Sequence, residues 1–285
     1  MHTARLLRPL AVAASVAALA MFAAAPAGAA ASSPSPTKVV HTHPIMLVPG
    51  ASTTGSTVDS FNWAGYATLP AHSGASFRFV KSTFTVPSVN CSTTPSSFSV
   101  HWVGLDGINE GANGTVEQDG VESDCSGSTP AYTAWWETFP GNTIQTAFTL
   151  NAGDAVTASV YFNTGSSHHD MYNIVLKDVT SGHGFNLWES CGASSGHKCL
   201  NASAEVISEA PSSTTGILPL ADYGIMNYVN IGVTDKSGQK GGITSSNWKD
   251  DEIIQVSQPK GTATLATPGS LFGSQAFSNT WKQES

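Results

Sequence analysis

The sequence predicts an all-β fold, an antiparallel β-sandwich of two large sheets with a jelly-roll or lectin-like arrangement. Short segments rich in Val, Ile, Thr, Phe and Tyr recur about every ten residues, with Gly, Asn, Ser and Pro between them. No stretch carries apolar residues at the helical period. This spacing is typical of sandwiches and barrels, and we favour the sandwich.

The sandwich domain is expected to span residues 61–285. The predicted strands cover residues 77–86, 98–105, 115–121, 132–139, 143–150, 156–162, 172–179, 183–189, 202–208, 224–233, 252–256 and 262–265.

The first sixty residues differ in composition from the rest of the chain. Arg5 and Arg8 precede an apolar run over 10–25, and the small residues that follow predict a signal peptide over residues 1–29. Residues 30–60 are rich in Ser, Thr and Pro and predict a flexible arm or a short pro-segment. No later segment is long and apolar enough to span a bilayer, so we expect a secreted, extracellular protein with no membrane partner.

The charge of the chain is low and acidic. Charged residues make up 11% of the sequence, against roughly 25% in a typical soluble domain. Without Arg5 and Arg8, 10 basic residues face 20 acidic ones, which gives a net charge of −10. This balance argues against nucleic acid as a partner. Because Lys and Arg are few, charge repulsion in acid should be weak, which is compatible with an acidic working environment.

Four cysteines in a secreted chain predict two disulfides. The sequence allows three pairings. The short Gly/Ser-rich separation favours a bond between Cys191 and Cys199, which leaves Cys91 to pair with Cys125.

The segment 98–121 combines a tryptophan, an aspartate and a glutamine in one hairpin. Its first strand breaks at Gly104, Asp106 and Gly107, and a Gly/Asn-rich turn leads to the second strand. Alternation places Gln118 on one face of that strand, whereas Glu117 and Asp119 point to the other.

Two further strands carry candidate acidic groups. Trp135 and Glu137 share one face of the segment 132–139. They would suit the binding of a sugar or an extended peptide. Alternatively, Trp135 is a core residue and Glu137 a charge at the rim of the sheet. Glu205 lies in a strand that looks buried on both faces, so its pKa is open to tuning. It is either an acid/base group or a structural glutamate. His168, His169 and the following Asp lack metal-ligand spacing and predict a polar turn, and we expect no metal and no cofactor.

Six short motifs occur in one order along the chain, and together they resemble the glutamic peptidases, the eqolisin or G1 family, as a secreted bacterial member. The motifs are NWAGY at 62–66, TFTVP at 83–87, HWVGLDG at 101–107, VEQDG at 116–120, AWWETFP at 134–140 and AEVISE at 204–209.

The resemblance implies a β-sandwich endopeptidase in which Gln118 and Glu205 form the catalytic dyad. It also implies that four residues line or support the substrate cleft: Trp102, Asp106, Trp135 and Glu137. The chain departs from the family pattern at Thr133, where close members have Asp, and at Val206, where they have an aromatic residue. Both departures put side-chain preference in question.

Peptide hydrolysis needs an activated water, a stabilised oxyanion and a proton for the leaving nitrogen. Glu205 can supply the first and the last of these, and the amide of Gln118 can donate to the oxyanion without titrating at low pH. We therefore expect a monomeric, acid-acting endopeptidase on polypeptide substrates. The alternative is a carbohydrate-binding or glycoside-hydrolysing sandwich that uses Trp135, Glu137 and Glu205.

Overall fold

The computed structural model describes residues 42–108, 114–142, 144–193 and 199–285, so the predicted signal peptide lies outside the described residues. Within these ranges the chain forms strands and no helix, and hence no helix that could cross a membrane. The strands are β1 (Thr57–Ser60), β2 (Trp63–Leu69), β3 (Phe77–Thr85), β4 (Val100–Leu105), β5 (Val116–Ser126), β6 (Thr129–Phe139), β7 (Gln145–Thr149), β8 (Ala155–Asn163), β9 (Met171–Asp178), β10 (Gly184–Ser190), β11 (Ala204–Glu209), β12 (Ser212–Ser213), β13 (Gly216–Ile217), β14 (Ile225–Asp235), β15 (Lys240–Gly241), β16 (Lys249–Val256), β17 (Thr264–Pro268) and β18 (Phe277–Trp281).

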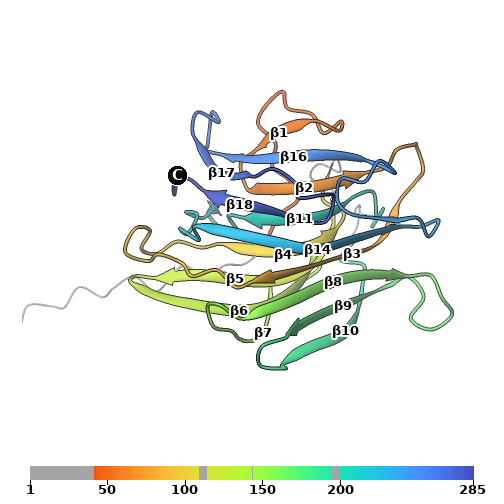
Figure 1. The fold of residues 1–285 in the computed structure, drawn as a ribbon, viewed down its shortest axis with the longest axis horizontal. Coiled ribbons are helices and arrows are strands. Elements are labelled where there is room, and N and C mark those ends of the chain that lie inside the picture. Colours follow the sequence, from red (N-terminus) through yellow and green to blue (C-terminus); the bar gives the residue numbers. More distant parts are fainter. Residues whose placement is uncertain (1–41, 109–113, 143, 194–198) are drawn as a thin grey trace, which may run out of the picture. The chain divides into compact units, whose positions relative to one another are not determined.

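One continuous path of hydrogen-bonded strands builds both layers of the sandwich. Its order is β10-β9-β8-β3-β14-β18-β17-β16-β2-β11-β4-β5-β6-β7, and every pair in it is antiparallel. In Figure 1 the path runs from β10 and β9 at the lower right to β16 and β17 at the top, then returns through β2, β11 and β4. Strands distant along the path, such as β4 and β8 or β5 and β9, lie against each other, so the path folds over into two layers. The predicted antiparallel sandwich is confirmed.

The layers enclose a core of alternating side chains. Val103 and Leu105 of β4 and Val206 of β11 belong to the same buried cluster as Val80 of β3 and Ile174 of β9. The opposite face of β2, β11, β4, β5 and β6 carries a second apolar cluster, which includes Trp63, Trp102, Trp135 and Ile207. These central strands are therefore buried on both faces.

All twelve predicted strands are present, but six were missed: β1, β2 and β18, and the two-residue strands β12, β13 and β15. Strand β2 is buried at every position, so it lacks the alternation that marks a half-exposed strand. It also contains Gly65 with φ of 146°, where a Cβ would lie 2.3 Å from the carbonyl oxygen of Val206. Only glycine allows β11 to approach this closely.

The described part of the segment predicted as a flexible arm packs on the sandwich. Strand β1 pairs in parallel with β16, and Leu47 forms a bridge to Ser60. The carboxylate of Asp251 accepts hydrogen bonds from the backbone amides of Gly55 (2.6 Å) and Ser56 (2.8 Å). Composition predicts flexibility here because apolar residues are few, but hydrogen bonds to distant strands hold the segment in place.

Both predicted disulfides are confirmed. Cys91, in the loop after β3, bonds to Cys125 near the end of β5, and Cys191 bonds to Cys199. The first bond ties the far end of the β4–β5 hairpin to the loop after β3. The second closes the connection between β10 and β11.

Candidate functional site

Four residues on adjacent strands form one cross-strand row. Glu205 of β11 pairs with Gly104 of β4, Gly104 pairs with Gln118 of β5, and Gln118 pairs with Glu137 of β6. Directly paired residues project to the same face of a sheet, and neighbouring strands lie about 4.8 Å apart. The backbones of Glu205 and Gln118 are therefore separated by about 10 Å, with only a glycine between them.

Gly104 lets the ring of Trp102 lie close to the backbone between the two side chains. A Cβ at this position would lie 2.8 Å from Cζ3 of Trp102 and 3.2 Å from Cβ of Gln118. The ring of Trp102 thus covers the glycine and forms the floor between Gln118 and Glu205. It is fixed by an edge-on contact with Trp63, with ring centroids 4.9 Å apart.

The amide of Gln118 is oriented by its neighbour in the row. Its Nε2 donates to Oε2 of Glu137 at 3.3 Å and to the hydroxyl of Thr42. Its Oε1 has no hydrogen-bond partner among the described residues. A carboxylate oxygen accepts only from a donor, so Glu137 fixes which end of the amide carries the NH2 group.

Glu205 is fully buried in the centre of the sheet. Its strand runs between β2 and β4, and its neighbours in register are Ala67 on one side and Gly104 on the other. Neither neighbour places a large side chain beside the carboxyl group. The predicted alternation is confirmed, because Ile207 joins the apolar cluster on this face and Val206 joins the core between the layers.

Trp135 lies on the same face as the row but is not an open cleft wall. It pairs with Gly120 of β5 and is fully buried, as is Trp102. The face therefore carries Gln118, Glu205, Glu137 and both tryptophans together, covered by other parts of the chain.

Asp106 lies beyond the row, at the end of β4. Its carboxylate accepts hydrogen bonds from the backbone amides of Asn201 (2.7 Å) and Ala202 (2.5 Å), and its own amide donates to the carbonyl of Ser203 (3.1 Å). Asp106 thus ties the end of β4 to the residues that lead into β11. These residues directly precede the strand that carries Glu205.

Replacing Asp106 should destabilise the fold. Asp106→Ala leaves two buried amides without their acceptor and places Ala at a φ of 70°, so we expect the free energy of unfolding to fall by about 3 kcal/mol. Asp106→Asn keeps one acceptor oxygen and tolerates this backbone conformation, so it should lose less. Urea unfolding of both variants measures the difference, and equal stabilities would contradict this role.

Sequence reasoning missed the structural roles of Glu209 and Asn62. The carboxyl group of Glu209 accepts from Nε1 of Trp102 (3.0 Å), from Nδ2 of Asn62 (3.2 Å) and from the amide of His43 (3.1 Å). Burial raises the pKa of Glu209 well above its ordinary range, although these hydrogen bonds oppose the effect. The sequence could have indicated that Glu209 lies near the site, because Glu205 and Glu209 are four residues apart on one strand and therefore share a face.

Asp119 points to the opposite face of β5 from Gln118. It is fully buried, and burial raises the pKa of its carboxyl group well above the ordinary value. In acid both the folded and the unfolded chain hold this proton. As the pH rises above about 4, the unfolded chain releases it first, so the folded state loses stability until the pH passes the raised pKa.

Asp119→Asn should therefore flatten the dependence of stability on pH. The substitution changes the free energy of unfolding by a constant amount at every pH. In addition, between the pKa of Asp119 in the unfolded chain and its raised pKa in the folded chain, the free energy of unfolding of the variant should rise relative to the parent by up to about 1.4 kcal/mol per pH unit. Urea unfolding with intact disulfides at about pH 3, 5 and 7 tests this. Asp59→Asn, at an exposed position on β1, is the control, and parallel pH profiles for Asp119→Asn and the parent would contradict the prediction.

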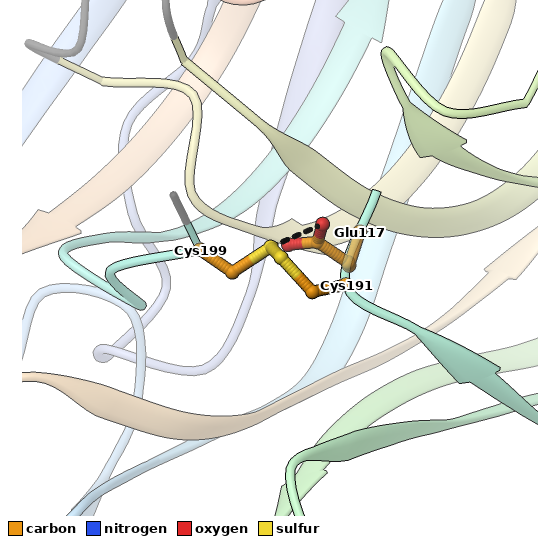
Figure 2. Close-up of side chains that lie close together, drawn as sticks. All are labelled: Glu117, Cys191 and Cys199. Carbon is orange, nitrogen blue, oxygen red and sulfur yellow. Dashed lines mark hydrogen bonds between the residues drawn. A yellow bond between two sulfur atoms is a disulfide. The ribbon is translucent and has the colours of Figure 1, made fainter. Parts of the chain in front are cut away.

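One cluster of the described residues has metal-ligand types, Glu117 with Cys191 and Cys199. Figure 2 shows the carboxylate of Glu117 facing the disulfide. Oε1 accepts from the amide of Gly192 at 3.2 Å, and Sγ of Cys199 lies 3.1 Å from it. A disulfide sulfur is neither a thiolate nor a hydrogen-bond donor, so this group is a structural contact rather than a metal site.

Comparisons with known proteins give the family of the chain and relatives of its fold. A model of the peptidase A4 family matches residues 61–281. Scytalido-glutamic peptidase, solved with a transition state analog inhibitor, superposes with a TM-score of 0.61 at 22% identity, over 78% of this chain and 98% of that chain. Aspergilloglutamic peptidase from Aspergillus niger gives a TM-score of 0.51 at 18% identity, over 65% of this chain and 99% of that chain. Identities this low show a shared fold. No curated protein sequence matches the chain.

Proposed function

This chain belongs to the peptidase A4 family and is a glutamic-type endopeptidase, and from that premise we propose that Gln118 and Glu205 are its catalytic dyad. The observation that carries the proposal is the row across four strands. It brings together one carboxyl group and one amide, separated by a glycine, with the amide oriented by Glu137.

In the proposed reaction Glu205 acts first as general base. Its carboxylate takes a proton from a water molecule as the water oxygen bonds to the peptide carbonyl carbon. The π electrons of the carbonyl move to its oxygen, and the Nε2 hydrogen of Gln118 that does not bind Glu137 stabilises that oxyanion. Glu205 then returns the proton to the amide nitrogen, the C–N bond breaks, and a carboxylic acid and an amine leave.

Each neighbour has a positioning role. Glu137 holds the amide of Gln118 with its NH2 end toward the row, and Trp102 supports the floor between the dyad residues. The amide does not titrate, so it can serve an enzyme that works in acid, where a histidine base would be protonated.

Several buried carboxyl groups favour a folded state that is stable in acid. Burial raises the pKa of Asp119, Asp124 and Glu209 well above the ordinary range, so these residues favour the folded state at low pH. His101 acts in the opposite direction, because burial lowers its pKa to about 3 and the unfolded chain gains its proton first as the pH falls. The disulfides and the predicted signal peptide support secretion. We propose a secreted, acid-acting enzyme.

The row also weighs against a glycosidase that pairs Glu137 with Glu205. Their strands are three spacings apart, about 14 Å between backbones, and Gln118 lies between them, bonded to the carboxylate of Glu137. A retaining or inverting pair needs carboxyl groups roughly 5–10 Å apart across one bond.

The test is an assay of the secreted protein on a denatured protein and on polysaccharides from about pH 2 to pH 7, a span that covers the ordinary Glu and His pKa values. Internal cleavage of the protein substrate that is strongest below about pH 5 is expected. Polysaccharide cleavage without proteolysis would overturn the proposal.

A further inference from the structure

The outer face of one layer of the sandwich carries a line of aromatic side chains. Trp188 of β10 pairs with Asn173 of β9, and Asn173 pairs with Tyr161 of β8. Tyr161 in turn pairs with Phe79 of β3, the next strand of the layer (Figure 1). Paired residues project to the same side of a sheet, and Val80, the neighbour of Phe79, belongs to the core between the layers. We call Phe79, Tyr161 and Trp188 the aromatic track, and all three are partly exposed on this outer face.

The rings of the aromatic track are held by contacts with one another and with two basic residues. The ring centroids of Phe79 and Tyr161 lie 6.5 Å apart, with 62° between the ring planes. Cζ of Arg78 lies 5.6 Å from the ring centroid of Tyr161, and the ring of His168 stacks on Trp188 with centroids 4.4 Å apart. Because these contacts hold the rings before anything binds, a ligand that packs on them loses little free energy to the ordering of side chains.

Two side-chain amides lie beside Trp188. Nδ2 of Asn173 donates to Oδ1 of Asn186 at 2.7 Å and to the carbonyl oxygen of Leu187 at 3.0 Å. Neither Oδ1 of Asn173 nor Nδ2 of Asn186 is engaged in a hydrogen bond with another described residue. The two amides therefore offer one acceptor and one donor. A sugar hydroxyl matches both, since it donates one hydrogen bond and accepts others.

A hollow of about 410 Å³ lies at the other end of the aromatic track. Phe79, Lys81, Lys240 and Gln275 are among the residues that line it. A Cβ on Gly232 of β14 would lie 3.1 Å from Cε of Lys81, so the glycine allows the stem of Lys81 to lie across β14. The hollow thus combines an aromatic ring, two ammonium groups and an amide.

The charge of this face is opposite to that of the whole chain. The outward residues of β3, β8, β9, β10 and β14, strands that the structure describes in full, include Lys81 and Lys177 and no Asp or Glu. Lys240 of β15 adds a third lysine at the hollow. In the loop between β8 and β9, Oδ2 of Asp170 lies 3.0 Å from Nδ1 of His169. The whole chain has 20 acidic and 12 basic residues, so this face stands out as one that favours an anionic partner.

A polysaccharide fits these features better than a polypeptide does. The backbones of β3, β8 and β9 are hydrogen-bonded to a neighbour on each side, so an extended peptide cannot add to them as a further strand. Only side chains are available, and flat aromatic rings match the C–H face of a pyranose ring while amides match its hydroxyl groups. We propose that this face binds an acidic polysaccharide, whose sugar rings pack on the aromatic track and whose carboxylates pair with Lys81 and Lys240.

The proposed polysaccharide site is separate from the candidate active site. None of its strands contributes to the row of Glu205, Gly104, Gln118 and Glu137. Binding of the polysaccharide therefore does not require that Gln118 and Glu205 are the catalytic dyad. It would hold the secreted enzyme on anionic polysaccharide through the face opposite the core from the dyad layer.

Isothermal titration calorimetry of the full chain with soluble polygalacturonate tests the proposal. At about pH 6 the carboxyl groups of this polymer are ionised, since the ordinary pKa of a carboxyl group is about 4. Methyl-esterified polygalacturonate is the matched ligand, because it has the same sugar backbone without the charge. The charged polymer should bind, the ester should bind several-fold more weakly, and added salt should reduce the difference.

Trp188→Ala and Lys81→Gln separate the two parts of the site. Trp188→Ala should weaken the binding of both polymers by about tenfold, and Trp188→Phe should restore most of it because it keeps a flat ring. Lys81→Gln should weaken only the binding of the charged polymer, by about threefold. Lys260→Gln, at an exposed position outside this face, is the matched control and should bind as the parent does. All four variants should keep the parental unfolding midpoint and the parental rate on a short peptide.

Four results would contradict the proposal. A parent chain that binds neither polymer overturns it, and equal affinity for the two polymers overturns the acidic class of the ligand. Equal binding by the parent, Trp188→Ala and Lys81→Gln overturns the location on this face. If Trp188→Ala leaves polysaccharide binding unchanged but raises KM on a denatured protein, and not on a short peptide, the face binds protein substrates instead.

Discussion

Glu205→Gln is expected to lower kcat/KM on peptide substrates by about 10⁴-fold while leaving the fold intact. The substitution keeps the size and shape of the side chain but removes the only group in the row proposed to take a proton from water and return it to the leaving amine. Rates on a quenched fluorescent peptide from about pH 2 to pH 7 measure the loss.

The control is Glu189→Gln, a matched substitution of a partly exposed residue on β10, a strand that contributes no residue to the row. It should retain parental activity and the parental unfolding midpoint. If Glu205→Gln hydrolyses peptides at the parental rate, Glu205 is not the general base. If it fails to fold, Glu205 is instead a structural group of the sheet centre.

Local alternation along each strand was enough to predict which face each candidate residue occupies. It placed Gln118 opposite Glu117 and Asp119, and it placed Glu205 with Ile207, and the pairing of the strands agrees in each case. This works because a strand's side-chain period is fixed at two residues whatever its partners are. The same rule grouped Trp135 with Glu137.

The pairing of strands could not be predicted in this way. Gln118 and Glu205 come together only because β4 pairs with β5 on one side and with β11 on the other, so that Gly104 lies between them. Such register depends on contacts between segments about a hundred residues apart, which no local pattern encodes. The glycine was interpreted as a strand break, whereas it lies within β4 between the two residues of the proposed dyad.

Backbone partners were equally hidden from sequence reasoning. Asp106 was expected to support the dyad, but its hydrogen-bond donors are the amides of Asn201 and Ala202, which have no side-chain signature. Thr42 lies in a stretch whose composition predicts flexibility, and only its contacts with Gln118 and Glu137 hold it in the site. The carboxylate of Asp106 accepts from peptide N–H groups, which every residue type shares, so its partners leave no trace in the sequence.

Gln118→Ala should lower kcat/KM on peptides by about 10²- to 10³-fold, the range seen when one oxyanion donor is removed from an acyl-transfer site. The effect should fall mainly on kcat, because the amide is proposed to bind charge that develops only in the transition state. Steady-state kinetics on a quenched fluorescent peptide separates kcat from KM.

The same variant separates the role of Gln118 from that of Glu205, and it also tests the glycosidase alternative. Without Gln118 the carboxyl group of Glu205 can still activate water, so we expect a residual rate above that of Glu205→Gln. The dependence of this residual rate on pH should still show the titration of Glu205. Gln255→Ala, at a buried glutamine on β16 whose Nε2 donates to the carbonyl of Phe61, controls for the loss of any buried amide in this sandwich and should leave kcat unchanged. An unharmed Gln118→Ala enzyme would mean that the amide is only a spacer between two carboxyl groups. The row would then have to be reinterpreted as the Glu137 and Glu205 pair of the carbohydrate alternative.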